Sequence, residues 1–408
     1  MFTPNVSGLY AARIISGLGI GALSVTGPMT IAELAPPEIR GLLTAWYSVM
    51  QMVALTSSTL TTYGIQLHMA PSRLQYQLAL FVPCIFMFLL SIFSFWLPES
   101  PRWLMLAGAH DEAVTALLRL RRLPASHPRI QQEIQAIWET IESETELSRN
   151  GARSFAGIKA VAKETFTVRS NVYRLQQALI LYVLPQLSGG NSVTNYFIPL
   201  TKILGIQHNP THGIFLSGMY ALSKLFFTLI ASFILIDGLG RRGSLFLGTT
   251  MQMICNIYLA AYLKVEQDTG ASHAASEAAL AFIFINAFGY AVGLLTLPYC
   301  FGGELWPDNI RSFGAALAQT CHWLFHFGMT YGLPGLLAAT DNWGAFVFFA
   351  AWCLIALVYV FFMVPEIANL SVEEMEKVFS RPMFTAYKAG GRKDEIQTLE
   401  GADLHDLS

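Results

Sequence analysis

Polar side chains interrupt two strongly apolar stretches of the sequence, and their types suit hydrogen bonding better than covalent chemistry. Gln186, Asn191 and Asn195 lie within residues 173–200, and Asn195 follows Asn191 by one helical turn on the same face. A second group lies downstream and comprises Tyr299, His322, Trp323 and His326. Such groups can replace the water that a hydroxylated solute loses on burial, which otherwise costs free energy. The alternative is that they only tie helices together.

The same residues give little support to metal binding or catalysis. His322 and His326 are spaced i, i+4, which could bring two imidazoles to one ion, but no third ligand accompanies them. The five cysteines fall in apolar stretches without a CxxC pair. Neither a phosphate-binding Gly-rich loop ending in Lys-Ser or Lys-Thr nor a catalytic triad is present. We expect no cofactor, no metal and no enzymatic activity.

The composition indicates that lipid surrounds most of the chain. Hydrophobic residues make up 53% of the 408 residues and charged residues 13%, whereas soluble domains carry about 25% charged residues. The mean hydropathy is +0.46. A helix needs about 20 mostly apolar residues to cross the hydrocarbon core. We therefore predict an all-α membrane protein with about nine transmembrane helices, at approximately 8–33, 41–66, 76–97, 173–200, 212–236, 243–263, 278–303, 312–338 and 343–364.

The distribution of Lys and Arg predicts the orientation, because basic residues are retained on the cytoplasmic side of short loops. If the polar stretch 105–170 faces the cytoplasm, 20 of the 25 Lys and Arg residues lie on that side. This places the C-terminal tail in the cytoplasm. Within the polar stretch, apolar residues recur at helical spacing over Glu112–Arg122 and Ile130–Leu147, which predicts two amphipathic helices.

Charged motifs repeat between the two halves of the chain. The pattern Glu, two residues, Pro, three residues, Arg begins at Glu33 and again at Glu304. Both copies lie on the predicted inner face. Such an internal repeat is typical of membrane proteins built from repeated halves.

Longer motifs carry a resemblance to a known family. Pro98–Leu104 reads PESPRWL, Gln186–Asn191 reads QLSGGN, and Asp237–Arg242 reads DGLGRR. Arg13–Gly21 and the pair Pro365–Glu366 add to these matches. In this order the motifs resemble the sugar porter branch of the major facilitator superfamily. The stretch Asn191–Tyr196, NSVTNY, most resembles the fungal hexose, lactose and quinate permease-like members of that branch.

The resemblance implies the major facilitator fold, in which two six-helix bundles enclose a substrate cavity and rock to expose either face. The nine segments resemble helices four to twelve, so the family's first three helices are expected to be lacking. The implied domains are a partial N-terminal bundle of three transmembrane helices, a cytoplasmic linker, a six-helix C-terminal bundle and a cytoplasmic tail, at residues 1–104, 105–170, 171–366 and 367–408.

The resemblance also implies which residues bind the substrate, with some departures. The expected substrate-binding residues are Gln186, Asn191, Asn195, Tyr299, His322, Trp323 and His326. The two histidines replace family asparagines, and Ser48 stands where many sugar carriers place a glutamine. Lys224 lies inside the fifth segment, where a cavity-facing position suggests an anionic substrate such as a carboxylated polyol. An interhelical salt bridge explains it equally well.

A second set of residues is expected to form ion pairs that latch the two bundles at the cytoplasmic surface when the cavity faces outward. The network comprises Glu33, Arg40, Glu99, Arg102, Asp237, Arg241, Arg242, Glu304, Arg311 and Glu366. In proton-coupled members of the family, the position of Arg13 pairs with an acid of the first helix. Arg13 is therefore the candidate coupling residue, and proton coupling stays open.

We predict a secondary transporter of a sugar, polyol or carboxylated polyol that works by alternating access, as a symporter or a uniporter. Two alternatives remain: a truncated paralogue that does not transport, and a nutrient sensor derived from a transporter. The expected partners are a small-molecule substrate and the lipid bilayer, with protons as an open third and no nucleic acid. The family's usual location is the plasma membrane.

Overall fold

A computed structural model describes residues 6–36, 39–148, 155–205, 210–270, 272–307, 310–367 and 378–379. Within these ranges the chain forms helices and no strand, and the all-α prediction is confirmed. The helices of the first part are α1 (Val6–Leu34), α2 (Arg40–His68), α3 (Arg73–Ser94), α4 (Pro101–Leu106), α5 (His110–Arg121), α6 (Pro128–Ser148) and α7 (Phe155–Thr167).

The second part contains both long helices and short helical segments. They are α8 (Arg169–Leu187), α9 (Gly190–Asn195), α10 (Phe197–Ile203), α11 (Pro210–Ile230), the π-helical turn η2 (Ala231–Leu235), α12 (Ile236–Thr269), α13 (His273–Tyr290), a second π-helical turn η3 (Ala291–Leu295), α14 (Leu297–Glu304), α15 (Arg311–Ala339) and α16 (Trp343–Met363).

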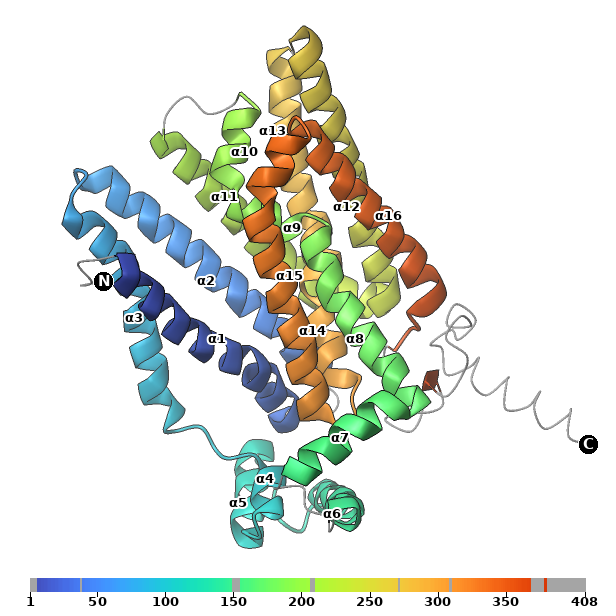
Figure 1. The fold of residues 1–408 in the computed structure, drawn as a ribbon. Helices are drawn as coiled ribbons and strands as arrows, with labels where there is room; N and C mark the ends of the chain where they lie inside the picture. The colour runs from blue at the N-terminus through green and yellow to red at the C-terminus, as the bar shows by residue number, and fades with distance from the viewer. Residues whose placement is uncertain are drawn as a thin grey trace, which may run out of the picture.

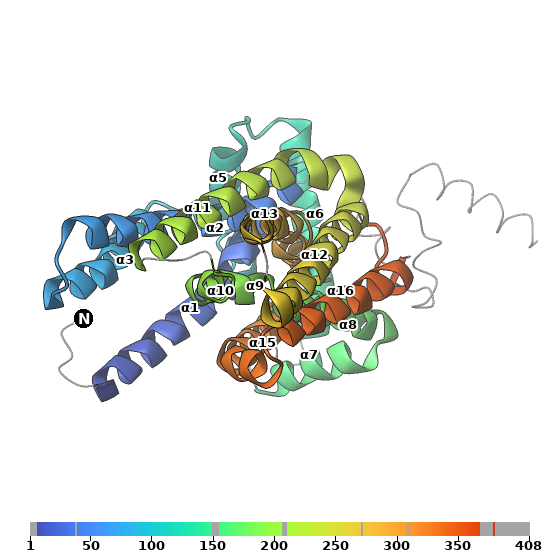
Figure 2. The same ribbon diagram turned by 90° about the horizontal axis from the view of Figure 1, so that it is seen from above.

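The helices form two groups, with α4 to α7 at one end (Figures 1 and 2). Helices α1 to α3 make one group and α8 to α16 the other. They meet where α2 packs on α11 and α1 packs on α15. Helices α4 to α6 lie below the first group in Figure 1, and α7 continues into α8. The amphipathic helices predicted between residues 105 and 170 match α5 and α6, whereas α7 was not foreseen.

Six helices of the described ranges are long and apolar enough to cross a membrane. They span Val6–Ile31, Arg73–Ser94, Thr211–Leu235, Gly238–Thr269, His273–Gly302 and Trp343–Met363. The other three predicted segments are helical too. They correspond to α2, to α15 and to the run from α8 to α10, all of which carry more polar side chains.

The predicted segment 173–200 is broken in its middle. Helix α8 ends at Leu187, and Gly189 has a φ of +84°, a left-handed conformation that favours glycine. A Cβ atom at Gly189 would lie 2.6 Å from Cδ2 of Phe349, so the close approach of α16 also requires glycine there. The break turns the chain so that α9 presents Asn191 and Asn195 from a short separate helix.

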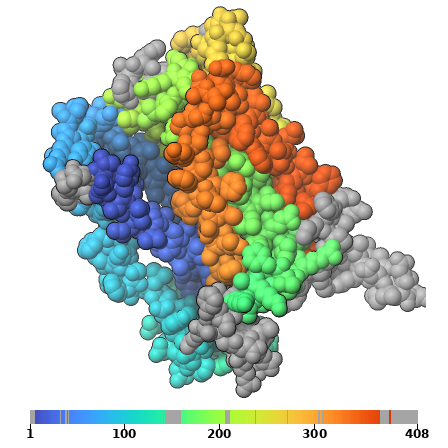
Figure 3. Space-filling view, in the orientation of Figure 1, coloured from blue at the N-terminus to red at the C-terminus, as the bar shows by residue number. Residues whose placement is uncertain are grey.

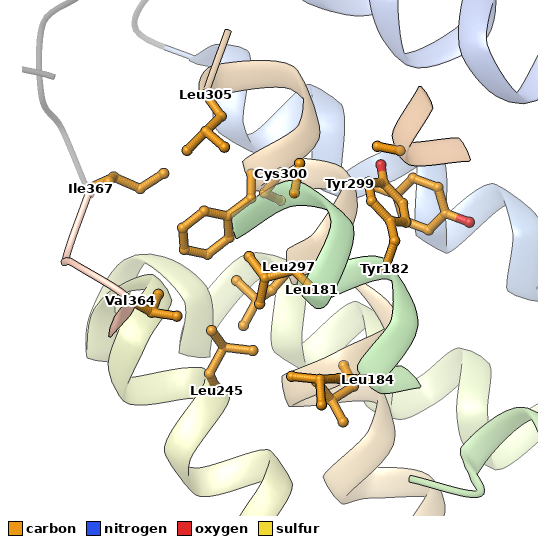
Figure 4. Close-up of a cluster of buried hydrophobic side chains, with 14 of the residues drawn as sticks. Leu181, Tyr182, Leu184, Leu245, Leu297, Tyr299, Cys300, Leu305, Val364 and Ile367 are labelled. Atoms are coloured by element: carbon orange, nitrogen blue, oxygen red, sulfur yellow. The ribbon is translucent and has the colours of Figure 1, made fainter. Parts of the chain in front are cut away.

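The hydrophobic core lies mainly inside the second group. One cluster joins α8, η3, α14 and α16, with Leu181, Leu184, Leu297 and Cys300 fully or almost fully buried. Figure 4 shows these side chains packed together, with Tyr182 and Tyr299 at one edge of the cluster. In contrast, α3 has no buried residue although its sequence is strongly apolar. An exposed helix that is apolar all round suits a lipid environment.

Candidate functional site

A cavity of about 420 Å³ lies between the two groups of helices. Its walls come from α1, α2 and α3 on one side and from α8, α9, α11, α13 to α15 and η3 on the other. In Figure 3 the surface is hollowed between α1 and α15, with α2 behind. Six of the seven predicted substrate-binding residues line the cavity, namely Asn191, Asn195, Tyr299, His322, Trp323 and His326.

Gln186, the seventh, is buried behind this wall and connects three of its residues. Its Oε1 accepts hydrogen bonds from Asn191 Nδ2 and His326 Nδ1, both at 3.0 Å. Its Nε2 lies 3.2 Å from His322 Nδ1 and donates to it. Only 1% of Gln186 is exposed. The amide therefore holds one side chain of α9 and two of α15 in fixed orientations, whereas its direct contact with a substrate stays a prediction.

The two histidines line the cavity with parallel imidazole rings. His322 and His326 lie one turn apart on α15, with ring planes 2° apart and centroids 6.2 Å apart. The bonds to Gln186 assign their tautomers: His322 accepts at Nδ1, while His326 donates from Nδ1. The Nε2 atom of His326 is then left for another partner. Trp323, between them, donates from Nε1 to Ser24 Oγ of α1 at 3.1 Å.

Tyr299 of α14 belongs to an aromatic and amide cluster shared with α2. Gln51 Nε2 donates to the Tyr299 hydroxyl at 3.3 Å, and the ring of Tyr47 lies 5.1 Å from that of Tyr299. Sequence reasoning missed Gln51 and Tyr47, although an amide inside the apolar stretch 41–66 is a signal that could have found Gln51. Ser48, by contrast, is fully buried away from the cavity. The first group of helices thus contributes an amide to the site, from Gln51 and not from position 48.

Asn195 lies near the exposed end of the cavity. Its Nδ2 donates to Thr330 Oγ1 of α15 at 3.4 Å, and the neighbouring Tyr196 donates its hydroxyl to the Thr330 carbonyl at 2.9 Å. These contacts tie the broken helix to α15. Asn195 and Asn191 therefore border the same space from one side, and the histidines border it from another.

Lys224 of α11 also lines the cavity and is 1% exposed. Its Nζ donates to Thr194 Oγ1 at 2.9 Å and lies 4.8 Å from the centre of the Tyr290 ring. In the part of the chain that the structure describes, Lys224 makes no ion pair. Of the two explanations for Lys224, the cavity-facing position is therefore observed and the interhelical salt bridge is not.

The predicted charge network is only partly visible. Glu366 accepts hydrogen bonds from the backbone N–H groups of Arg241 and Arg242 at 3.1 and 3.0 Å. The Arg242 side chain donates to the Phe361 carbonyl. These contacts lie beside Gly240, whose φ of +78° kinks α12, and they join α12 to the end of α16. They are internal to the second group of helices.

The other members of the network are described only in part. Arg311 Nη2 donates to the Trp306 carbonyl at 3.5 Å. The side chains of Arg40, Asp237 and Glu304 lie outside the described residues. The latch, in which Glu33, Glu99 and Arg102 also take part, therefore stays a prediction. So does the coupling role of Arg13, whose side chain is exposed on α1.

One charged contact that sequence reasoning missed does link two parts of the chain. Arg121 of α5 makes a two-pronged ion pair with Glu133 of α6 at 2.6 and 3.0 Å. The same guanidinium donates to the Leu34 carbonyl at the end of α1 at 2.9 Å. It thereby fixes the linker helices to the membrane helices.

Comparisons with known proteins agree with this architecture. The chain is 32% identical over 389 residues to a "probable quinate permease" of Aspergillus niger, which covers 93% of this chain and 70% of that protein. It is 29% identical over 393 residues to the "MFS-type transporter qa-x" of Neurospora crassa, covering 94% and 71%. Among solved structures, the proton:xylose symporter XylE bound to 6-bromo-6-deoxy-D-glucose superposes with a TM-score of 0.74 at 22% identity, covering 90% of this chain and 73% of XylE.

The XylE match shows the major facilitator fold, which confirms the predicted fold class. A model of the family described as "Sugar (and other) transporter" matches residues 1–379, which include every residue that the structure describes. This match, with the apolar helices, makes the protein an integral membrane protein. The chain belongs to the Sugar (and other) transporter family.

Proposed function

We propose that the protein is a secondary transporter that carries a polyhydroxylated solute, a sugar, polyol or carboxylated polyol, across the membrane. The observation that carries the proposal is the cavity of about 420 Å³, lined by hydrogen-bonding side chains from both groups of helices. Asn191, His322 and His326 come from one group and Gln51 from the other. A solute with several hydroxyls can exchange its hydration for these groups.

The relatives support this substrate class. The Aspergillus niger protein is named for quinate, a ring with four hydroxyls and a carboxylate. XylE is named as a proton:xylose symporter. Both compounds share the dense hydroxyl pattern that the cavity suits. No enzymatic activity is proposed, because the relatives are named as transporters.

Alternating access would work by exchanging contacts between the two groups of helices. Hydrogen bonds from Trp323 to Ser24 and from Gln51 to Tyr299 join the groups beside the cavity. A substrate that binds one arrangement of these contacts better shifts the population toward it. The same proposal includes four further points from the sequence. They are the equivalence of the nine segments with helices four to twelve, proton coupling through Arg13, the cytoplasmic tail and the plasma membrane location.

Uptake by proteoliposomes that contain the 408-residue chain tests the proposal. Labelled xylose, glucose and quinate are offered separately, with protein-free vesicles as the blank. Gln51→Leu removes an amide from the cavity and should reduce uptake. Gln135→Leu makes the same change on the exposed face of α6 and should leave uptake unchanged. Absence of uptake of every solute by the unmodified chain would overturn the proposal and favour the non-transporting alternatives.

A further inference from the structure

Among the described residues, the amino group of Lys224 makes one hydrogen bond inside the cavity wall. An ammonium group has three N–H donors, and Thr194 Oγ1 accepts one of them. Thr194 in turn donates its hydroxyl to the Gly190 carbonyl at 2.9 Å, which orients the oxygen toward Lys224. The faces of Tyr290 and Tyr220, at 4.8 and 5.9 Å, flank the same nitrogen. The cation is therefore held in place by three neighbours, none of which carries a negative charge.

Lys224 is the one Lys or Arg among the described residues that line the cavity, and none of those residues is Asp or Glu. The two histidines are held as neutral tautomers by their hydrogen bonds to Gln186. Removing an ammonium group from water is costly unless an anion or strong hydrogen bonds compensate. Contacts with aromatic faces compensate only in part. An anionic ligand would therefore stabilise the protonated amino group of Lys224, which no acid among the described lining residues does.

The neighbouring groups suit the uncharged part of the same ligand. Asn191 and Asn195 lie on the helix that also carries Thr194, and His322 and His326 lie on α15. These side chains can donate to and accept from hydroxyls. A ligand with a carboxylate at one end and hydroxyls along its ring can therefore contact Lys224 and this polar surface together.

We propose that Lys224 is the carboxylate-binding residue of this site, and that the preferred substrate is a polyhydroxylated monocarboxylate. Thr194 positions the amino group through its hydrogen bond. This inference rests on the proposed function and narrows it from polyhydroxylated solutes in general to their carboxylates. A purely structural lysine would support the fold without distinguishing a charged ligand from a neutral one.

Quinate and its methyl ester provide the test, because the two share a ring and hydroxyls and differ in the negative charge. Binding is measured as the ligand-induced shift of thermal unfolding of the purified chain, and transport as competition in proteoliposomes. The unmodified chain should bind quinate at least about tenfold more tightly than the ester, a difference of about 1.4 kcal/mol. Lys224→Gln should abolish this preference by weakening quinate binding while the ester still binds. Retained ester binding shows that the variant is folded.

Lys264→Gln is the matched control, because Lys264 loses the same charge from an exposed pair with Asp268. It should keep the preference for quinate. Equal binding of quinate and ester by the unmodified chain would overturn the inference, and that comparison needs no variant. An equal loss of both ligands in Lys224→Gln would also overturn it. Failure of the proposed function has a different signature: no uptake, although quinate binding still depends on Lys224.

Discussion

Replacing Gln186 by leucine should loosen the cavity wall without introducing a steric clash. The change keeps a side chain of similar size but removes the amide that joins Asn191, His322 and His326. Three hydrogen bonds at about 0.6 kcal/mol each inside a membrane protein amount to about 2 kcal/mol. If this ordering is needed for binding, the apparent affinity for substrate falls by about 30-fold.

The matched control is Gln252→Leu on α12. Gln252 is as deeply buried as Gln186, but neither atom of its amide has a hydrogen-bond partner among the described residues. Replacing an unsatisfied buried amide by an apolar group should be neutral or stabilising. The same substitution at two buried glutamines therefore has opposite expected effects.

Thermal unfolding in detergent and concentration-dependent uptake are the two measurements. Gln186→Leu should lower the melting temperature and raise the half-saturating substrate concentration, whereas Gln252→Leu should do neither. If both variants behave alike, the hydrogen-bond hub has no energetic role. If only stability changes, Gln186 supports the fold and does not organise the binding surface.

Three further changes have defined outcomes. Gly189→Ala should lower the melting temperature more than Gly108→Ala. Both positions have positive φ, so alanine incurs about 1–2 kcal/mol of strain at either, but only at Gly189 would the new methyl group clash with the ring of Phe349. Equal effects would contradict this reasoning. Arg121→Gln should speed deuterium exchange in α5 and α6 more than Glu133→Gln does, since only the first loses the bond to the α1 carbonyl. Glu366→Gln should weaken the start of α12 after its kink by about 1 kcal/mol, seen as faster exchange of the two amides that its carboxylate holds; unchanged exchange would show that the charge is dispensable.

Much of the site was predictable because its polar residues stand out in apolar sequence. Asn191, His322 and His326 were recognised in this way, and they line one cavity. Gln51 carried the same signal and was overlooked, because the glutamine of the family corresponds to Ser48. Thr194 carried no signal, since threonine is ordinary in a membrane helix, and its importance arises only from the nearby amino group of Lys224.

The sequence by itself determined the all-α membrane architecture, because the length and apolarity of each segment are local properties that decide whether it can cross a lipid bilayer. It also indicated the family through motifs with defined spacing. Only the tertiary structure decided that Gln186 lies behind the cavity wall and that Lys224 faces the cavity without an acidic partner. Both facts depend on how α8, α11 and α15 rotate and pack against one another. The bonds that hold Gln186 join residues more than 100 positions apart, and the contacts of Lys224 with Thr194 and Tyr290 also cross between helices, so no local pattern records either arrangement.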